Sequence, residues 1–461
     1  MNYQYNDKYL FSATVRRDGS SVFAPESRYG TFPSATIGWR ISQEDFLKGT
    51  KWLNDLKLRA SYGSLGSNNI AATNAFTLFG SGFGQSSYPI TGSSNVATQG
   101  FYNNGIGNAG GHWETDKILN VGIDATLFNS LDFNLEYYRK SISGLLFPAT
   151  LPATLGGATA PFVNNGDISN KGFDLGVTYR GKTGSDFSYN VGVNITTYNN
   201  KFTYIPGNGY LDVSGSRLGT LVREAIGQPV GEFFGYNQIG YFKDVADVTN
   251  SPTQAGAAPG RFKYQDVNGD GKIDANDRTF FGNPNPKFTY GVNLGANYKG
   301  FDASVILWGS QGNKNINLTK YYTNFYSTLI GNKSNDLLNN SWTPTNLNPK
   351  TPIAELGNSF SSTDAFSSYY MENGSFLKCR QASIGYTFPP QVLKNIQADR
   401  LRVYFQVTNL FTITKYSGLD PELQPSSGNL GTYQQSGAFG IDYGNYPNNQ
   451  RGFLAGINLT F

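Results

Sequence analysis

The sequence has 461 residues, of which 15% are charged and 15% are aromatic, and its formal net charge is +4. Soluble proteins average about 25% charged residues, so this composition is short of charge for an ordinary soluble domain. The small positive charge includes no basic run, which argues against nucleic acid as a partner. The single cysteine, Cys379, excludes an intrachain disulfide framework.

Apolar and polar residues alternate with a period of two in many segments, as expected of strands that have one apolar face. Turn residues (Gly, Asn, Asp and Pro) bound these segments and predict about fifteen strands. In chain order, the predicted strands are residues 1–5, 9–17, 29–41, 56–63, 118–128, 131–141, 172–180, 187–202, 220–226, 231–242, 288–299, 301–310, 376–388, 401–411 and 453–461. No window approaches about 18 consecutive apolar residues, which excludes a transmembrane helix.

The alternation is clearest in the strand predicted at residues 118–128. Leu119 and Val121 fall on one face of this strand, and Asn120 and Asp124 fall on the other. An apolar face opposite a face of Asn, Asp, Thr, Ser and Gly is typical of a transmembrane β-barrel, in which lipid lies outside and water or polar contents lie inside.

The predicted connections alternate between short and long, as in outer-membrane barrels with tight periplasmic turns and long outer loops. With the C-terminus placed in the periplasm, every long connection lies on the outer side of the membrane. The sequence therefore predicts an all-β protein, a transmembrane antiparallel β-barrel, with residues 1–461 forming one barrel domain. This count leaves Met1 at the outer end of a descending strand, and no signal peptide begins there. We therefore expect upstream strands to be missing.

Residues 266–277 match the twelve-position calcium loop, with oxygen ligands at positions 1, 3, 5 and 9 and a glycine at position 6. The candidate ligands are the side chains of Asp266, Asn268, Asp270, Asp274 and Asp277 and the backbone carbonyl of Lys272. Asp277 replaces the usual glutamate at position 12, and no helix pattern flanks the loop. We therefore expect modest affinity for Ca²⁺, suited to the extracellular side. The alternative is an Asp- and Gly-rich turn that binds no ion.

The long outer loops contain aromatic side chains suited to stacking on sugars or to contacting a peptide. The candidates for substrate binding are Tyr102, Trp113, Tyr321, Tyr322, Trp342, Tyr369 and Tyr370. The alternative for each ring is packing of one loop against another. Motifs of enzymes are absent from the sequence, including Gly-x-Ser-x-Gly, a Walker loop and zinc-ligand spacing. We therefore predict that the protein is not an enzyme.

Several segments together resemble the C-terminal barrel of the SusC/RagA family. They are residues 8–21 (KYLFSATVRRDGSS), 113–128 (WETDKILNVGIDATLF), 228–242 (QPVGEFFGYNQIGYF), 262–299 (which includes DVNGDGKIDANDRTFFGNPNPKF), 407–422 (VTNLFTITKYSGLDPE) and 440–461. The resemblance extends over essentially the whole chain. It implies a TonB-dependent outer-membrane transporter of a Gram-negative bacterium, whose complete barrel has about 22 strands around a plug. About fifteen of them would be present here, without the plug.

The resemblance further implies a nutrient importer for glycans or oligopeptides. A SusD-like lipoprotein would close its mouth, and TonB–ExbB–ExbD would drive uptake. Signal peptide, TonB box and plug have no counterpart in these residues, so TonB contacts would lie in missing N-terminal regions and the fragment alone would not transport. Two alternatives stay open: a passive outer-membrane porin or translocator, and a secreted calcium-dependent β-rich adhesin.

Overall fold

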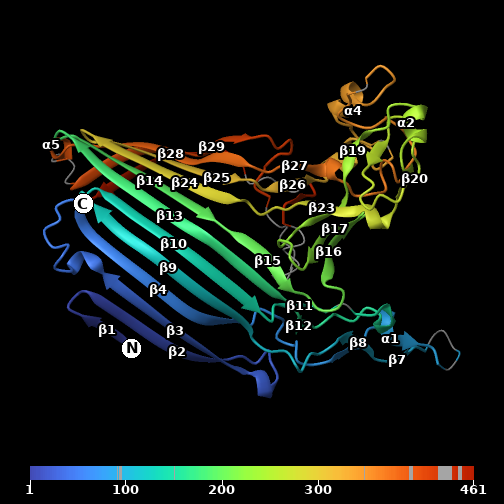
Figure 1. Ribbon diagram of the computed structural model, residues 1–461, viewed down its shortest axis with the longest axis horizontal. Coiled ribbons are helices and arrows are strands. Elements are labelled where there is room, and N and C mark those ends of the chain that lie inside the picture. Colours follow the sequence, from blue (N-terminus) through green and yellow to red (C-terminus); the bar gives the residue numbers. More distant parts are fainter. Residues whose placement is uncertain are drawn as a thin grey trace.

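A large antiparallel sheet dominates the computed structural model of the protein (Figure 1). The structure describes residues 1–90, 92, 96–149, 151–325, 327–346, 348–393, 398–423, 439–444 and 449–461. Within this part of the chain, the large sheet has 14 strands, in the order β1-β2-β3-β4-β9-β10-β13-β14-β24-β25-β28-β29-β31, with β15 pairing with β13. Its strands are β1 (Asn2–Tyr5), β2 (Tyr9–Gly19), β3 (Tyr29–Arg40), β4 (Leu53–Ser67), β9 (Glu114–Leu127), β10 (Leu131–Ser143), β13 (Asp167–Thr183), β14 (Phe187–Thr197), β15 (Asn199–Tyr204), β24 (Phe288–Tyr298), β25 (Phe301–Gln311), β28 (Phe376–Thr387), β29 (Arg400–Thr414) and β31 (Gly452–Thr460).

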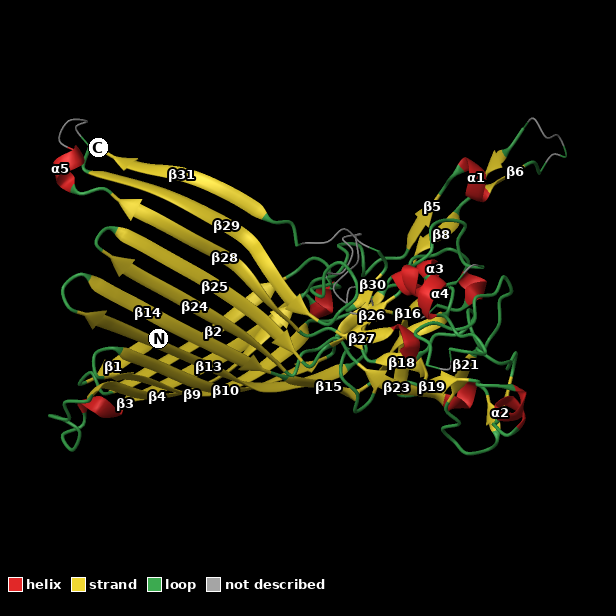
Figure 2. Ribbon diagram, turned by 90° about the horizontal axis from the view of Figure 1, so that it is seen from above, coloured by secondary structure: helices red, strands yellow, loops and turns green. Residues whose placement is uncertain are grey.

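Strands that follow one another along this order pair antiparallel, and short turns join several of them at one end of the sheet. The β9–β10 turn has Phe128 and Asn129 at φ 54° and 56°, and the β1–β2 turn has Asn6 and Asp7 at φ 49° and 55°. Two central residues with positive φ define the turn whose twist matches that of the flanking strands. The prediction that short turns gather at the end where the chain finishes is confirmed, because β31 also ends there (Figure 2).

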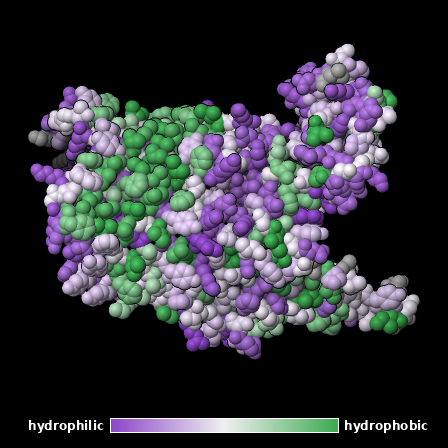
Figure 3. Space-filling view, viewed as in Figure 1, coloured by the Kyte–Doolittle hydropathy of each residue, from purple (hydrophilic) through white to green (hydrophobic). Residues whose placement is uncertain are grey.

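The two faces of the large sheet differ as the alternation predicted. Leu119, Val121 and Ile123 of β9 are 36–46% exposed although they are apolar. Figure 3 shows apolar residues gathered over the large sheet towards its short-turn end, whereas hydrophilic residues prevail towards the opposite end. Exposed apolar side chains in such number are expected of a surface that faces lipid rather than water.

The long connections form smaller sheets beyond the other end of the large sheet (Figures 1 and 2). We call residues 205–287, 312–375 and 439–444 the outer lobe, and residues 76–105 the arm. The strands of the arm are β5 (Leu78–Gly80), β6 (Ser87–Tyr88), β7 (Thr98–Gln99) and β8 (Tyr102–Gly105), and a separate pair joins β11 (Leu146–Pro148) and β12 (Phe162–Asn164). The strands of the outer lobe are β16 (Tyr210–Ser216), β17 (Gly219–Ala225), β18 (Phe233–Tyr236), β19 (Gln238–Tyr241), β20 (Thr253–Gln254), β21 (Phe262–Tyr264), β22 (Lys272–Ile273), β23 (Arg278–Gly282), β26 (Lys314–Asn317), β27 (Met371–Asn373) and β30 (Ile441–Asp442).

Helices are few and short in the described part of the chain. The α-helices are α1 (Phe83–Ser86), α2 (Val245–Thr249), α3 (Thr319–Thr323), α4 (Asn335–Asn340) and α5 (Pro390–Leu393). The 3₁₀ helices are η1 (Pro25–Ser27), η2 (Ile41–Gln43), η3 (Ala153–Leu155), η4 (Ala275–Asp277) and η5 (Ser368–Tyr370). None of the helices among the described residues is long and apolar enough to cross a membrane.

The predicted all-β antiparallel barrel fold is confirmed, but two predicted barrel strands belong to the outer lobe. Residues 220–226 form most of β17, and residues 231–242 contain β18 and β19, all outside the large sheet. Leu221 and Val222 are fully buried in the core of the lobe. A strand that packs on a protein core contains apolar residues just as a strand that faces lipid does, so the sequence pattern did not separate the two cases.

Candidate functional site

The inner wall of the sheet, opposite the apolar face, contains a cluster of charges. Arg59 of β4 lies across the sheet from β9 and β10, where its guanidinium contacts Asp124 at 3.2 Å and Glu136 at 2.5 Å. Lys57 contacts the same Asp124 carboxylate at 2.8 Å. Asp124, which the alternation placed on the polar face of its strand, is therefore neutralised by two basic residues of the neighbouring strand β4, and Arg59 also reaches Glu136 on β10. The basic residues lie far from the acidic ones along the chain, so no local sequence pattern indicated these pairs.

Uncharged asparagines continue the inner wall across β10, β14 and β24. Asn134, Asn190, Asn194 and Asn293 are all exposed. Three of them lie flat over glycines of the next strand, because a Cβ atom added at Gly176, Gly291 or Gly295 would fall 2.1–2.4 Å from the Oδ1 atom of Asn134, Asn194 or Asn190, respectively. The pairing of large polar residues with glycines keeps the wall smooth and lines it with amide groups. Amides both donate and accept hydrogen bonds, so this wall suits a neutral polar solute.

The outer lobe encloses an aromatic core that includes several of the rings predicted to bind substrate. Tyr370 is fully buried and Tyr369 is 9% exposed. The Tyr369 ring lies 4.8 Å from the ring of Phe262, and Tyr321 packs against the same core. In this conformation Tyr369 and Tyr370 hold the lobe together and present no face to a ligand, which corresponds to the loop-packing alternative. Tyr322, also on α3, is partly exposed.

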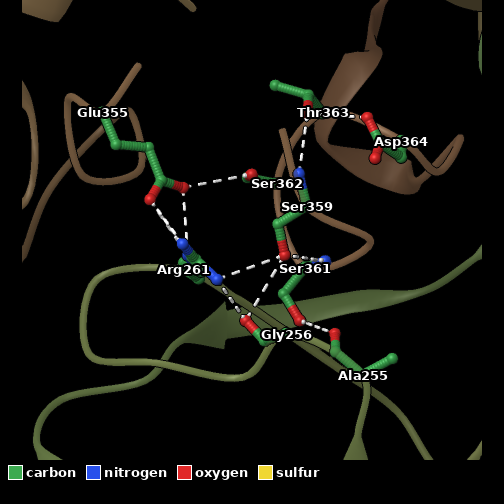
Figure 4. A network of polar contacts seen from close by, with 9 residues as sticks. All are labelled: Ala255, Gly256, Arg261, Glu355, Ser359, Ser361, Ser362, Thr363 and Asp364. Atoms are coloured by element: carbon green, nitrogen blue, oxygen red, sulfur yellow. Dashed lines mark hydrogen bonds and ion pairs between the residues drawn. The ribbon is translucent and has the colours of Figure 1, made fainter. Parts of the chain in front are cut away.

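Trp342 is also buried in the lobe, at 8% exposure, and its ring covers Gly260. Next to it, Arg261 joins two distant loops of the lobe (Figure 4). Its guanidinium contacts the Glu355 carboxylate at 2.6 Å and donates to the Gly256 carbonyl at 2.7 Å. The Ser359 hydroxyl receives a weaker bond from Arg261 at 3.3 Å. This network fixes residues 355–364 against β20 and β21, and it gives the lobe a defined surface.

Of the two remaining candidate rings, Tyr102 belongs to the arm, and Trp113 follows the arm along the chain. Trp113 packs between Phe23 and Phe32, with ring centroids 5.4 and 5.5 Å apart, and its indole donates to the Arg28 carbonyl. Trp113 therefore anchors the β2–β3 loop. Tyr102 begins β8, where it pairs with β5 and remains partly exposed. The structure does not bring the seven rings together in one site.

The predicted calcium ligands lie on the loop between β21 and β23. The oxygens of Asp266 accept bonds from the Gly269 and Gly271 amides at 2.7 and 2.9 Å, so the loop wraps around this carboxylate. Asp277 is fully buried, and amides of Val267 and Asp274 hold its oxygens. These hydrogen bonds lower the pKa of Asp277 despite its burial. The donor set of carboxylate and amide oxygens is the one that a hard cation prefers. Among the described residues, no three His, Cys, Asp or Glu side chains are already gathered closely enough to hold a metal ion.

A buried ion pair attaches the last long connection to the sheet, and no local sequence pattern indicated it. The Lys378 ammonium of β28 contacts Asp420 at 2.7 Å and Glu422 at 2.9 Å, and the side chains of Lys378 and Asp420 are 1% and 4% exposed. Glu422 also pairs with Arg380. A lysine buried this deeply requires a carboxylate partner, so the 420–422 segment is held in place.

Another buried carboxylate lies where the outer lobe joins the sheet. Glu224 of β17 is fully buried and accepts a hydrogen bond from the Gly231 amide at 3.0 Å. Burial raises the pKa of Glu224 to about 8, and the neighbouring Glu232 carboxylate acts in the same direction. The carboxyl is therefore a group whose charge changes near neutral pH.

Comparison with known proteins agrees with the fold. The model of the family described as TonB dependent receptor-like, beta-barrel matches residues 1–410. TonB-dependent receptor P3 of Formosa agariphila is 32% identical, over 100% of this chain and 45% of that protein. TonB-dependent receptor SusC of Bacteroides thetaiotaomicron is 29% identical, over 100% of this chain and 43% of SusC. The chain thus spans about half the length of the curated relatives it matches.

Among solved structures, the RagAB peptide transporter superposes with a TM-score of 0.81 over 100% of this chain and 46% of that chain, at 24% identity. At this identity the superposition shows the fold alone. The predicted resemblance to the SusC/RagA group is confirmed by these matches together. TonB-dependent receptors are transporters, so the prediction that the protein is not an enzyme is confirmed as well. The chain belongs to the TonB-dependent receptor-like β-barrel family, whose members are outer-membrane proteins of Gram-negative bacteria.

Proposed function

We propose that this chain supplies barrel wall and outer mouth to an importer of glycans, with oligopeptides as the alternative cargo. The observation that carries the proposal is the amide-lined inner wall. Asn134, Asn190, Asn194 and Asn293 are exposed on it and offer neutral donors and acceptors. Sugar hydroxyls and peptide groups are neutral hydrogen-bonding partners of the same kind, and they pass such a wall without the cost of stripping water from a charge.

The proposal includes two partners of the full-length protein. A SusD-like lipoprotein would close the outer mouth, and TonB–ExbB–ExbD would drive uptake through parts of the protein outside these 461 residues. The support is similarity to SusC and to the RagAB importer, whose structures have been described in "closed-closed" and "open-open" states. Opening of the mouth in this protein would involve the outer lobe and the arm. Both lie at the end of the large sheet where the long connections are found.

The test is uptake of labelled neutral oligosaccharides and of oligopeptides by cells that produce the full-length protein. We expect uptake of one of these classes, and we expect it to stop when TonB is deleted. Asn190→Leu combined with Asn194→Leu should lower uptake, whereas Asn250→Leu, on the outer lobe next to α2, should not. Uptake that continues without TonB, together with rapid swelling of liposomes containing the purified protein, would instead establish a passive porin.

We also propose that residues 266–277 bind Ca²⁺ at concentrations of about 0.1–1 mM, the range of extracellular modules. The support is the ligand spacing and the way Gly269 and Gly271, at φ 75° and 81°, fold the loop around Asp266. Calorimetry on the full-length protein should show one site that Asp266→Ala with Asp270→Ala abolishes. Asp45→Ala, at an exposed carboxylate of the short-turn end, is the control. Absence of binding by the unaltered protein at about 1 mM Ca²⁺ would refute the proposal.

A further inference from the structure

Four basic side chains lie close together on the lipid-facing side of the large sheet, towards the end with the long connections. Strand pairing sets Arg139 of β10 directly opposite Lys171 of β13 on one side and Leu119 of β9 on the other, so these three side chains share a face. One row nearer the long connections, the same face has Lys117 of β9 and Lys201 of β15. All four basic side chains are exposed. We call Lys117, Arg139, Lys171 and Lys201 the basic patch.

The basic patch has no acidic partner within the chain. Among the described residues, none of its four side chains contacts a carboxylate. On the inner wall, by contrast, basic side chains do contact carboxylates, as seen at Lys57, Arg59, Lys140 and Arg402. Like charges directly opposite each other in a sheet are destabilising, and Arg139 and Lys171 form such a pair. An anion from outside the chain would therefore stabilise the patch.

The basic patch lies where the apolar band of the sheet ends. Arg139 is the ninth residue of β10 counted from the short turn, and a strand crosses the hydrocarbon core of a membrane in about 9–11 residues. On the side towards the short turns, the rings of Tyr137 and Phe173 pack 5.2 Å apart, as expected of an aromatic belt at the membrane interface. Figure 3 shows hydrophilic residues bordering the apolar region towards the long connections. The four cations thus lie at the depth of lipid headgroups.

We infer that the basic patch binds the phosphate of an anionic membrane lipid, in the leaflet next to the long connections. Phosphate oxygens accept strong hydrogen bonds from ammonium groups and from the forked guanidinium of Arg139. The acyl chains of the same lipid would lie along Leu119, Val121 and Phe173, which are apolar and 39–51% exposed. A zwitterionic lipid has a cation of its own that offsets its phosphate, so it fits the unpaired cations less well. The occupant is therefore an amphiphile with a net negative charge.

The experiment is lipid titration of the full-length protein in a neutral detergent, followed by native mass spectrometry. Dioleoylphosphatidic acid is the main probe, dioleoylglycerol has the same chains without the phosphate, and inorganic phosphate has no chains. The patch variant is Arg139→Gln with Lys171→Gln, and the matched control is Lys51→Gln with Lys182→Gln, two exposed lysines of the short-turn end. Each basic residue near an anionic lipid surface contributes about fivefold in affinity. We expect the patch variant to bind phosphatidic acid about 25-fold more weakly, and the control to bind it as the unaltered protein does.

Heat-modifiable migration in detergent confirms that each variant is folded. Equal affinity of the unaltered protein for phosphatidic acid and dioleoylglycerol would overturn the inference, since the phosphate would then not be recognised. Equal affinity for inorganic phosphate would overturn it too, and would make the patch a site for a free anion. So would equal weakening in the control, or loss of a dimer of this chain with lipid binding unchanged, which would make the patch a contact between copies. None of these outcomes involves uptake, so the proposed function is tested separately.

Discussion

Lys378 provides the sharpest test of how the outer connections are held to the barrel. Its ammonium lies between Asp420 and Glu422, at 2.7 and 2.9 Å, and is 1% exposed. The substitution Lys378→Met keeps the length and packing of the side chain and removes the charge. Asp420 would then remain 4% exposed, with the backbone amide of Glu422 as the partner of one oxygen and none shown for the other.

Removing one member of a buried ion pair costs about 3–5 kcal/mol, because the other charge remains buried without compensation. Each 1.4 kcal/mol is a factor of ten, so local opening of residues 415–423 should become about 100-fold more frequent or greater. Hydrogen exchange of peptides from this segment, measured by mass spectrometry on the full-length protein in detergent, reports this opening directly.

Two further variants make the measurement decisive. Lys378→Met with Asp420→Leu replaces both charges by apolar groups and should recover most of the protection, since Glu422 can still pair with Arg380. Lys48→Met breaks a pair with Asp45 whose side chains are 60% and 84% exposed, and it should leave the free energy of unfolding essentially unchanged. If Lys378→Met changes exchange of the 415–423 segment no more than Lys48→Met does, the buried pair does not hold this connection.

Three other predictions concern the outer lobe and the base of the arm. Because the pKa of Glu224 is about 8 when folded and 4.5 ordinarily, the folded state binds more protons between these values, so stability should fall as pH rises through this window. Thermal melting should show this fall, and Glu224→Gln should flatten it; an unchanged slope would contradict it. Arg261→Met should release the Glu355 loop at a cost of about 2 kcal/mol, seen as faster proteolysis, and Arg261→Lys should not restore the forked contact. Asn74→Ala should leave the Phe162 amide without its acceptor and weaken the base of the arm by about 1–3 kcal/mol, measurable by exchange at the arm but not at Glu224.

The strand pattern was readable from the sequence because it is a local property. Alternation in residues 119–127 predicted β9 and identified its two faces, and the short turn predicted at Asn129-Ser130 placed the next strand beside it. The same pattern misassigned residues 220–226 to the barrel, since β17 buries Leu221 and Val222 against protein instead of lipid. The period-two pattern indicates that a strand has an apolar side, but it does not indicate whether protein or lipid covers that side.

The candidate site was less predictable, because its contacts join residues far apart in the chain. Arg59 meets Glu136 across two strand pairings, and Lys378 meets Asp420 after the chain has crossed the sheet and returned. The burial of some aromatic candidates was unpredictable for a related reason. A ring such as Tyr370 stacks on other rings in a core as readily as it stacks on a sugar, and only its full burial in the lobe distinguishes the two roles.

The surfaces of this chain differ in composition because they face different surroundings: lipid, the interior of the barrel, or water. A surface that faces lipid admits no unpaired backbone group and tolerates few charges, so the outer face of the large sheet has little freedom to vary. Selectivity must therefore reside in the inner wall and in the long connections. The inner wall combines neutralised charges at Arg59 with amides at Asn194, and in the proposed function these groups line the path of a neutral polar solute. The arm, in contrast, avoids charge while lying in water, where charge costs nothing. The contrast between the two places shows that low charge in this chain is not dictated by lipid alone, and it supports the proposal that the wall, whose amides donate and accept hydrogen bonds, lines the path of the cargo.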